Sequence, residues 1–283
     1  AVIARMFASK ITATGTIALS RNNIERYLVD GYILDTDKTG NLIYAGSHRR
    51  LCMNDVDPTA FSICDTNPSF AIPDGFVWKM NSSLVSIWGK EINGTGIEVV
   101  SAVGTDNQDN VYLYGTFNSN AEFDGNILVP VPAKSNAFVA KLNSGGNYAY
   151  VKQLSAEDLY ITEYPTDAEA PFAVDTKGNV FLGGAFAGTL NYYGNTLTST
   201  SPPASFYANG FLLKLNSSGN LRWGEKFAGE VGPFDETAVH GISVLGSNLA
   251  VSGEFAYYNA YQNDTVNSDG NAFFLSAIQD CDV

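Results

Sequence analysis

One short pattern returns along the chain at constant spacing. The stretch "GNLIYAG" (Gly40–Gly46) recurs as "DNVYLYG", "GNVFLGG" and "SNLAVSG". Each copy contains one matching asparagine, and successive copies are 69 residues apart: Asn41, Asn110, Asn179 and Asn248. A fixed period of this length is typical of repeat architectures, in which every repeat is one supersecondary unit. We therefore interpret the 283 residues as a single repeat domain.

A second pattern predicts a hairpin in each repeat. Apolar and polar residues alternate and then reach an Asn-Ser-Gly turn, which is typical of a strand entering a hairpin. The turn is followed by another strand, and Phe76 to Trp88, Phe138 to Tyr150 and Phe211 to Trp223 are each 12 residues apart. The pattern occurs in Asp74–Ser83, Ser135–Gly146, Asn209–Gly219 and Gly270–Ile278, and Ala1–Ser9 fits it as well.

Together with the strand before each asparagine motif, these segments give four strands per repeat. We predict an all-β fold, a β-propeller of about four four-stranded units of roughly 69 residues. A linear array of independent hairpin units is the alternative. Extra small hairpins are expected at Ala121–Leu128 and Thr189–Leu197, with a weaker one at Asn259–Val266. The expected units are 1–20 (partial), 21–91, 92–153, 154–227 and 228–283.

The order of these motifs resembles the SBBP-type β-propeller repeat family of large secreted and surface proteins. The resemblance rests on "AVDTKGNVFLGGAF" (Ala173–Phe186), "YYGNTL" (Tyr192–Leu197) and "FLLKLNSSGNLRWGEK" (Phe211–Lys226). It extends over nearly the whole chain and is loosest over Arg49–Pro73. It implies a structural or adhesive role without a defined catalytic site.

The unit count leaves a surplus strand. The chain begins and ends on a strand of the third type, and Ile11–Leu19 is expected to supply a fourth strand beside Ala272–Ile278. Ala1–Arg5 is then a surplus strand with no place in the four units. The chain is a segment of a longer protein, or the ring closes elsewhere, or the surplus strand pairs with another subunit. Pairing with other subunits would give a homo-oligomer or filament, because head-to-tail contacts that do not close propagate.

Composition favours an extracellular or cell-surface protein. The formal charge is −13, so phosphate backbones and anionic membranes are repelled, and nucleic-acid binding and membrane insertion are not expected. No run of 18 apolar residues occurs.

Two kinds of covalent modification are predicted. We expect a disulfide between Cys52 and Cys64. Sequons at Asn81, Asn93, Asn216 and Asn263 are either N-glycosylation sites or turn residues that form the motif by chance.

Few residues are candidates for catalysis or metal binding. His240 is expected to be a hydrogen-bonded core residue, and His48 a loop residue near the disulfide rather than a zinc ligand. The acidic pairs Asp167/Glu169 and Asp235/Glu236 are interpreted as solvated loops, although paired carboxylates can hydrolyse glycosides. Oxygen-rich Asp35–Asn41 and Asp106–Asn110 are interpreted as turns, with calcium as the alternative. No cofactor is expected.

Aromatic residues offer the remaining candidate surface. Trp88 and Trp223 occupy equivalent positions and are expected to pack between sheets, whereas Tyr257, Tyr258 and Tyr261 form a candidate recognition surface for proteins or surface glycans. We predict a non-enzymatic extracellular structural or adhesive module that assembles with other protein subunits by strand pairing. The alternative is a glycan-binding or polysaccharide-degrading propeller.

Overall fold

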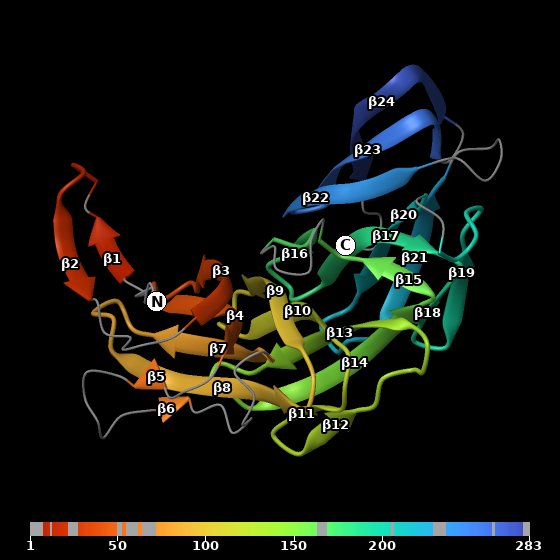
Figure 1. The fold of residues 1–283 in the computed structure, drawn as a ribbon. Coiled ribbons are helices and arrows are strands. Elements are labelled where there is room, and N and C mark those ends of the chain that lie inside the picture. The colour runs from red at the N-terminus through yellow and green to blue at the C-terminus, as the bar shows by residue number, and fades with distance from the viewer. Residues whose placement is uncertain are drawn as a thin grey trace.

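The computed structural model describes residues 8–11, 13–21, 28–49, 53–54, 62–63, 72–162, 169–204, 207–228, 236–261 and 264–279. Every element in these residues is a β-strand, and the sheets follow one another along an open arc (Figure 1). Within the same residues, no helix has the length and apolar character needed to cross a membrane. The predicted all-β repeat fold is therefore confirmed, while closure into a ring is not seen.

Four antiparallel sheets follow the repeats in chain order. The first contains β3 (Leu28–Thr36), β4 (Leu42–Arg49), β7 (Asp74–Met80) and β8 (Ser86–Gly94). The second contains β9 (Glu98–Thr105), β10 (Val111–Phe117), β13 (Ser135–Leu142) and β14 (Tyr148–Ala156). The third contains β15 (Asp158–Tyr160), β16 (Phe172–Val174), β17 (Val180–Ala187), β20 (Asn209–Leu215) and β21 (Leu221–Phe227), and the fourth contains β22 (Thr237–Leu245), β23 (Asn248–Tyr261) and β24 (Asp264–Gln279). Two short pairs, β1 (Ala8–Ile11) with β2 (Ile17–Arg21) and β5 (Met53–Asn54) with β6 (Ser62–Ile63), stand apart.

The expected extra hairpins are present, and the first two complete the sheet of the preceding repeat. β11 (Ala121–Phe123) and β12 (Asn126–Leu128) extend the first sheet, because β11 pairs with β8. β18 (Thr189–Tyr192) and β19 (Asn195–Thr198) extend the second sheet in the same way, through β14. In the fourth repeat, where the weaker hairpin was expected at Asn259–Val266, residues 259–261 pair with residues 264–266 as the outer part of the long β23–β24 hairpin.

In the second, third and fourth repeats the glycine that ends the motif is required by close backbone approach. A Cβ placed on Gly115 would lie 2.0 Å from the Val99 carbonyl oxygen of β9. On Gly253 it would lie 2.0 Å from the Ala238 carbonyl oxygen of β22. These distances are far below van der Waals contact, so no other residue fits without moving the neighbouring strand.

In the first three repeats the asparagine of the motif belongs to a turn built on aspartate. Asp37 Oδ1 accepts hydrogen bonds from the backbone N–H groups of Thr39 and Asn41, and Asp37 Oδ2 accepts one from the Asn41 side chain. Asp106 and Asn110 repeat the arrangement, as do Asp175 and Asn179. The predicted turns at Asp35–Asn41 and Asp106–Asn110 are confirmed by these hydrogen bonds, and calcium binding there stays an untested alternative.

A buried ion pair joins this turn to the third strand. Lys79 Nζ lies 2.8 Å from Asp37 Oδ2, and both side chains are almost completely buried. Burial by itself would raise the pKa of Asp37, but the hydrogen bonds from Lys79 and from Asn41 lower it to about 2. The carboxylate is therefore charged at neutral pH and neutralises the lysine beneath the turn.

The N-terminal hairpin has the register of a third–fourth strand pair, but its first strand is Ala8–Ile11 rather than the predicted Ala1–Ser9, most of which lies outside the described residues. Its register shifts between Lys10 and Ile11. Equivalent shifts occur in the three other third–fourth pairs, at Lys79/Met80, Lys141/Leu142 and Lys214/Leu215. The prediction that Ile11–Leu19 lies beside Ala272–Ile278 is wrong: β2 pairs with β1, and the hairpin and fourth sheet stand at opposite ends of the arc (Figure 1). The local turn around Gly15, whose φ is 80°, closes this pair without help from the fourth sheet.

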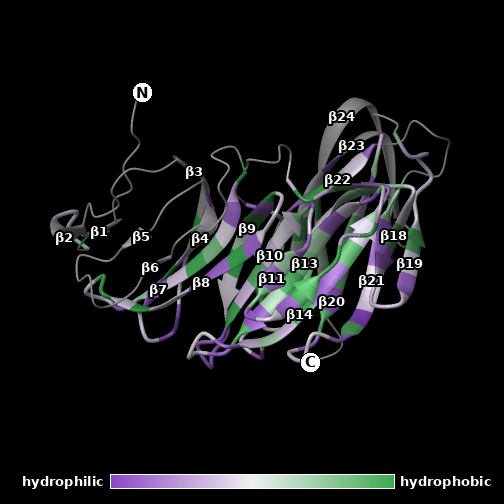
Figure 2. Ribbon diagram, turned by 60° about the horizontal axis from the view of Figure 1, so that its bottom comes forward, coloured by the Kyte–Doolittle hydropathy of each residue, from purple (hydrophilic) through white to green (hydrophobic). Residues whose placement is uncertain are grey.

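The hydrophobic cores lie between successive sheets. Hydrophobic residues are frequent in the central strands β13 and β20 (Figure 2), and every residue of β20 is buried, so this strand is covered on both faces. The aromatic residue of the fourth strand reaches the next repeat: the Trp88 ring packs on Gly146, and its Nε1–H donates to the Ser144 carbonyl over 2.9 Å. The Tyr150 ring lies on Gly219 in the same manner. The predicted packing of both tryptophans between sheets is confirmed: Trp223 contacts Phe181 of its own sheet and packs against the core cluster that the third and fourth sheets share.

We predict that Gly115→Ala destabilises the protein by about 3 kcal/mol or more, because the added methyl group collides with backbone rather than with a side chain. Urea unfolding followed by circular dichroism measures the change. Gly145→Ala is the control, since its Cβ would make only an ordinary 3.4 Å contact with Asn143. Equal losses in the two variants would contradict the close-approach argument.

We also predict that Asp37→Ala costs about 3–5 kcal/mol in unfolding free energy, because it leaves the Lys79 ammonium buried without its charge partner. The matched control is Asp124→Ala, which removes an ion pair of Lys90 whose members are both partly exposed. This exposed pair should be worth about 1 kcal/mol or less. The same unfolding assay ranks the two variants, and similar costs would refute the proposed difference.

Candidate functional site

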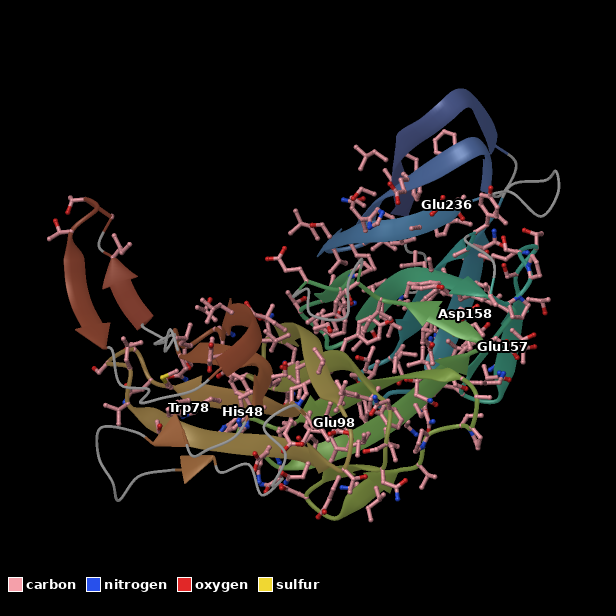
Figure 3. The ribbon with its side chains drawn as sticks, viewed as in Figure 1. His48, Trp78, Glu98, Glu157, Asp158 and Glu236 are labelled. Carbon is pink, nitrogen blue, oxygen red and sulfur yellow. The ribbon has the colours of Figure 1, made fainter. Side chains whose placement is uncertain are left out.

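A pocket lies between the third and fourth sheets. It has a volume of about 310 Å³ and is lined by residues of β15, β17, β22 and β23 and by the segments that adjoin them. The walls include Tyr160, Ala185, Val239, His240 and Glu254. Figure 3 shows the Glu236 side chain beneath the fourth sheet, on the side that faces the third. Such concave sites between structural units are common binding sites.

A β-bulge places His240 in this pocket. Along β22, Val239 pairs with Gly253 and Gly241 pairs with Ser252, so His240 is the extra residue between them. Its side chain is 47% exposed, and its Nε2 lies 3.1 Å from Glu254 Oε1. The expectation of a core histidine is therefore wrong, because the bulge turns the side chain out of the alternation of the strand.

Glu236 is the second acidic group of the pocket. Burial raises its pKa, and the nearby charge of Glu254 raises it further. Glu236 is half-buried in the pocket wall, so the interpretation of Asp235/Glu236 as a solvated loop is wrong for Glu236, while Asp235 lies outside the described residues. In the other predicted pair Glu169 is exposed, and Asp167 also lies outside the described residues.

A second group of ionisable side chains is buried between the first and second sheets. His48 lies within β4, fully buried, with its Nε2 3.1 Å from Glu91 Oε1 and its ring against Phe76. It is therefore a strand residue rather than a loop residue. Nearby, Glu98 is fully buried, accepts a hydrogen bond from Ser119 and shares one with Asp74. Burial raises the pKa of Glu98 to about 7, although these two hydrogen bonds act in the opposite direction.

Several predicted residues cannot be compared with the structure. Outside the described residues lie both members of the predicted disulfide and one sequon: Cys52, Cys64 and Asn263. The backbone of β23 includes the tyrosine surface, but the side chains of Tyr257, Tyr258 and Tyr261 are also outside the described part. The disulfide and the recognition surface therefore stay predictions.

The other sequons lie in or near turns. Asn81 and Asn216 each accept two backbone hydrogen bonds within their own turn, which confirms that they are turn residues. Asn93 lies in β8 and pairs with Glu122 of the captured hairpin. Glycosylation of these residues remains a prediction. No group of three or more His, Cys, Asp or Glu side chains is arranged to hold a metal ion in the portion of the chain that the structure describes.

The outer edge of the fourth sheet is the third notable feature. The order β22–β23–β24 ends on the third strand, whereas the first three sheets continue to β8, β14 and β21. Leu275 on β24 is 79% exposed. An edge strand presents unpaired backbone N–H and C=O groups and is a template for strand addition.

Comparison with known proteins finds a distant similarity to a repeat protein. The chain is similar to an uncharacterized WD repeat-containing protein of Acanthamoeba polyphaga mimivirus, with 24% identity over 219 residues. The match covers 68% of this chain but 15% of that protein, so the chain spans only a small part of its relative. No protein-family model matches the chain. Fold and comparison agree on a repeat β-sheet protein.

The sequence indicated Glu236 and His240 separately but did not connect them with Glu254. Glu254 directly follows the motif glycine Gly253, and the bulge in β22 brings His240 opposite this end of β23. Glu98 was missed altogether, because nothing in "GIEVVSAVG" distinguishes a buried glutamate from one at the exposed start of a strand. Only the packing of the first sheet against the second reveals it.

We predict that Glu98→Gln removes a pH dependence of stability. A carboxyl group whose pKa is raised on folding contributes stability below its ordinary value of 4.5, and this contribution is lost as the pH rises through about 7. The wild type should thus lose on the order of 3 kcal/mol between pH 4.5 and 8 at this residue. Glu98→Gln should be more stable than wild type at pH 8. Urea unfolding at several pH values tests this, with the exposed Glu122→Gln as control; identical profiles would rule the effect out.

Proposed function

We propose that the chain is a non-enzymatic structural or adhesive module of the β-propeller type, which acts at the cell surface or outside the cell and assembles with other protein subunits by strand pairing. The finer assignment to SBBP-type repeats rests on the sequence resemblance, and that to WD-type repeats on the distant relative. Propeller closure is part of the proposal, because four-stranded sheets in series are the units from which propellers are built.

The observation that carries the proposal is the three-stranded fourth sheet. The preceding sheets are each finished by a fourth strand, and two of them capture a hairpin of the next repeat as well. Strand addition is therefore already the way in which this molecule joins its repeats. β24 offers the same kind of edge without a fourth strand among the described residues. A strand of the β2 type, from another subunit or another repeat, would complete it.

The N-terminal hairpin provides a complementary element. β1 and β2 form a third–fourth pair with the register shift of the other repeats, yet in the described residues they pair only with each other. They stand at the opposite end of the arc from β24 (Figure 1). A contact between the two ends of different molecules is heterologous, and it gives rings or filaments according to whether the rotation closes.

A glycan-binding or polysaccharide-degrading propeller is the second candidate. It is favoured by one observation, the presence of Glu236 and Glu254 in one pocket with Tyr160. Paired carboxylates support glycoside hydrolysis, and an aromatic ring stacks on sugars. Release of reducing sugar from a panel of polysaccharides, abolished in Glu254→Gln, would replace the structural role with this one.

We expect sedimentation velocity of the purified chain to show species that grow with protein concentration. Leu275→Lys should shift assembly to about tenfold higher concentration, equivalent to about 1.4 kcal/mol, because a lysine on an edge strand opposes strand addition. The matched control is Leu34→Lys, which replaces a leucine that is 62% exposed on β3 at the other end of the arc. A monomeric mass at every concentration, or equal effects of the two variants, would refute assembly through β24.

A further inference from the structure

The pocket between the third and fourth sheets is a place where the repeats differ. In the second repeat the corresponding bulge falls at Ser101, which is buried, and its carbonyl accepts the N–H groups of Glu169 and Ala170, each over 2.8 Å. In the fourth repeat the bulged residue is His240, and its side chain is nearly half exposed. The same backbone irregularity is thus sealed in one repeat and opens onto a pocket in the other.

The floor of the pocket is apolar and the wall is acidic. Ile161, Ala185 and Val239 line it and are each at least 95% buried. Tyr160, which is 46% exposed, adds an aromatic ring beside them. A ligand that fills this space therefore needs an apolar part.

The charges of the pocket do not balance. His240 is paired with Glu254, whereas the Glu236 carboxylate has no hydrogen-bond donor or cation within bonding distance among the described residues. Glu236 and Glu254 repel each other, which contributes to the raised pKa of Glu236. The wall thus holds two carboxylates beside one histidine, and a cation between the carboxylates would relieve their repulsion.

We propose that this pocket binds an organic cation with an apolar stem, the chemistry of a lysine or arginine side chain. The stem lies on Ile161, Ala185 and Val239, and the cationic head lies between Glu236 and Glu254. Charge-assisted hydrogen bonds to carboxylates are stronger than neutral ones, and burial of an alkyl stem adds to them. Tyr160 contributes its ring face to the same cation. A neutral sugar could stack on Tyr160 but would leave the two carboxylates repelling each other.

Titration of the full chain with agmatine, a guanidinium on a four-carbon stem, tests the proposal. Amide chemical shifts in ¹H–¹⁵N spectra should change saturably at Ala185, Val239 and Glu254. n-Butanol, which has the stem without the charge, and glucose should bind at least about tenfold more weakly. Equal binding of agmatine and n-butanol, or tighter binding of glucose, would overturn the cation proposal.

Variants distinguish binding in this pocket from nonspecific attraction of a cation to an acidic protein. Glu236→Gln and Glu254→Gln should each weaken agmatine binding about tenfold. Glu122→Gln removes the same negative charge at an exposed position of β11 and should leave agmatine binding unchanged. The fold of each variant is verified from the unchanged shifts of β10 and β13. A similar loss in Glu122→Gln would show nonspecific attraction to an acidic protein and would refute the site.

A peptide identifies the natural source of the cation. The blocked peptide acetyl-Gly-Arg-Gly-amide presents the same head group on a polypeptide. Binding tighter than that of agmatine indicates a side chain of a partner protein, and weaker binding indicates a free amine or guanidine. Absence of saturable binding for both probes overturns the proposal.

Discussion

The arrangement of each repeat depends on how closely the first strand approaches the second at the motif glycine. At Gly115 and Gly253 the carbonyl oxygen of the neighbouring strand occupies the place of a Cβ, so the two backbones lie nearer than any other residue allows. Bulges at Ser101 and His240 lie next to these contacts in the paired strand. A bulge increases local twist, and twisted sheets can stack face to face along an arc. The glycine thus determines the shape of the sheet as well as its register.

Contacts between repeats follow the same spacing as the sequence. The Tyr114 hydroxyl donates to the Gly183 carbonyl, 69 residues away, and Lys38 N–H donates to the Asp109 side chain of the next turn. Trp88 and Tyr150 reach forward onto Gly146 and Gly219. These contacts connect neighbouring repeats only, which is the pattern of quasi-one-dimensional proteins. The stability of one repeat therefore depends on its immediate neighbours.

The strand pattern could be predicted from the sequence because period, alternation and turn residues are local properties. The order of the strands at the edges of the sheets could not be predicted in this way. The segment Ala121–Leu128 has the sequence of a hairpin, but nothing in it shows that β11 pairs with β8 of the preceding sheet rather than within its own. Likewise, Ile11–Leu19 closes on itself because a local turn requires less loop-closure entropy than a pairing across the whole chain. The pocket was missed for the same reason, since a one-residue bulge decides where His240 points.

The capture of each small hairpin by the preceding sheet has a consequence for synthesis. β8 receives β11 only after about thirty further residues have left the ribosome, and β14 waits similarly for β18, at elongation rates of roughly 5–20 residues per second. Glu157, at the end of β14, accepts the N–H of Thr189 over 2.6 Å and so holds the incoming hairpin at its first residue. The edge strands β8 and β14 therefore remain unpaired on one side for seconds during synthesis, until the hairpin of the following repeat pairs with them. Truncation after the first or second repeat would leave this edge strand permanently unpaired, and a cell would have to degrade such fragments or bind them with chaperones.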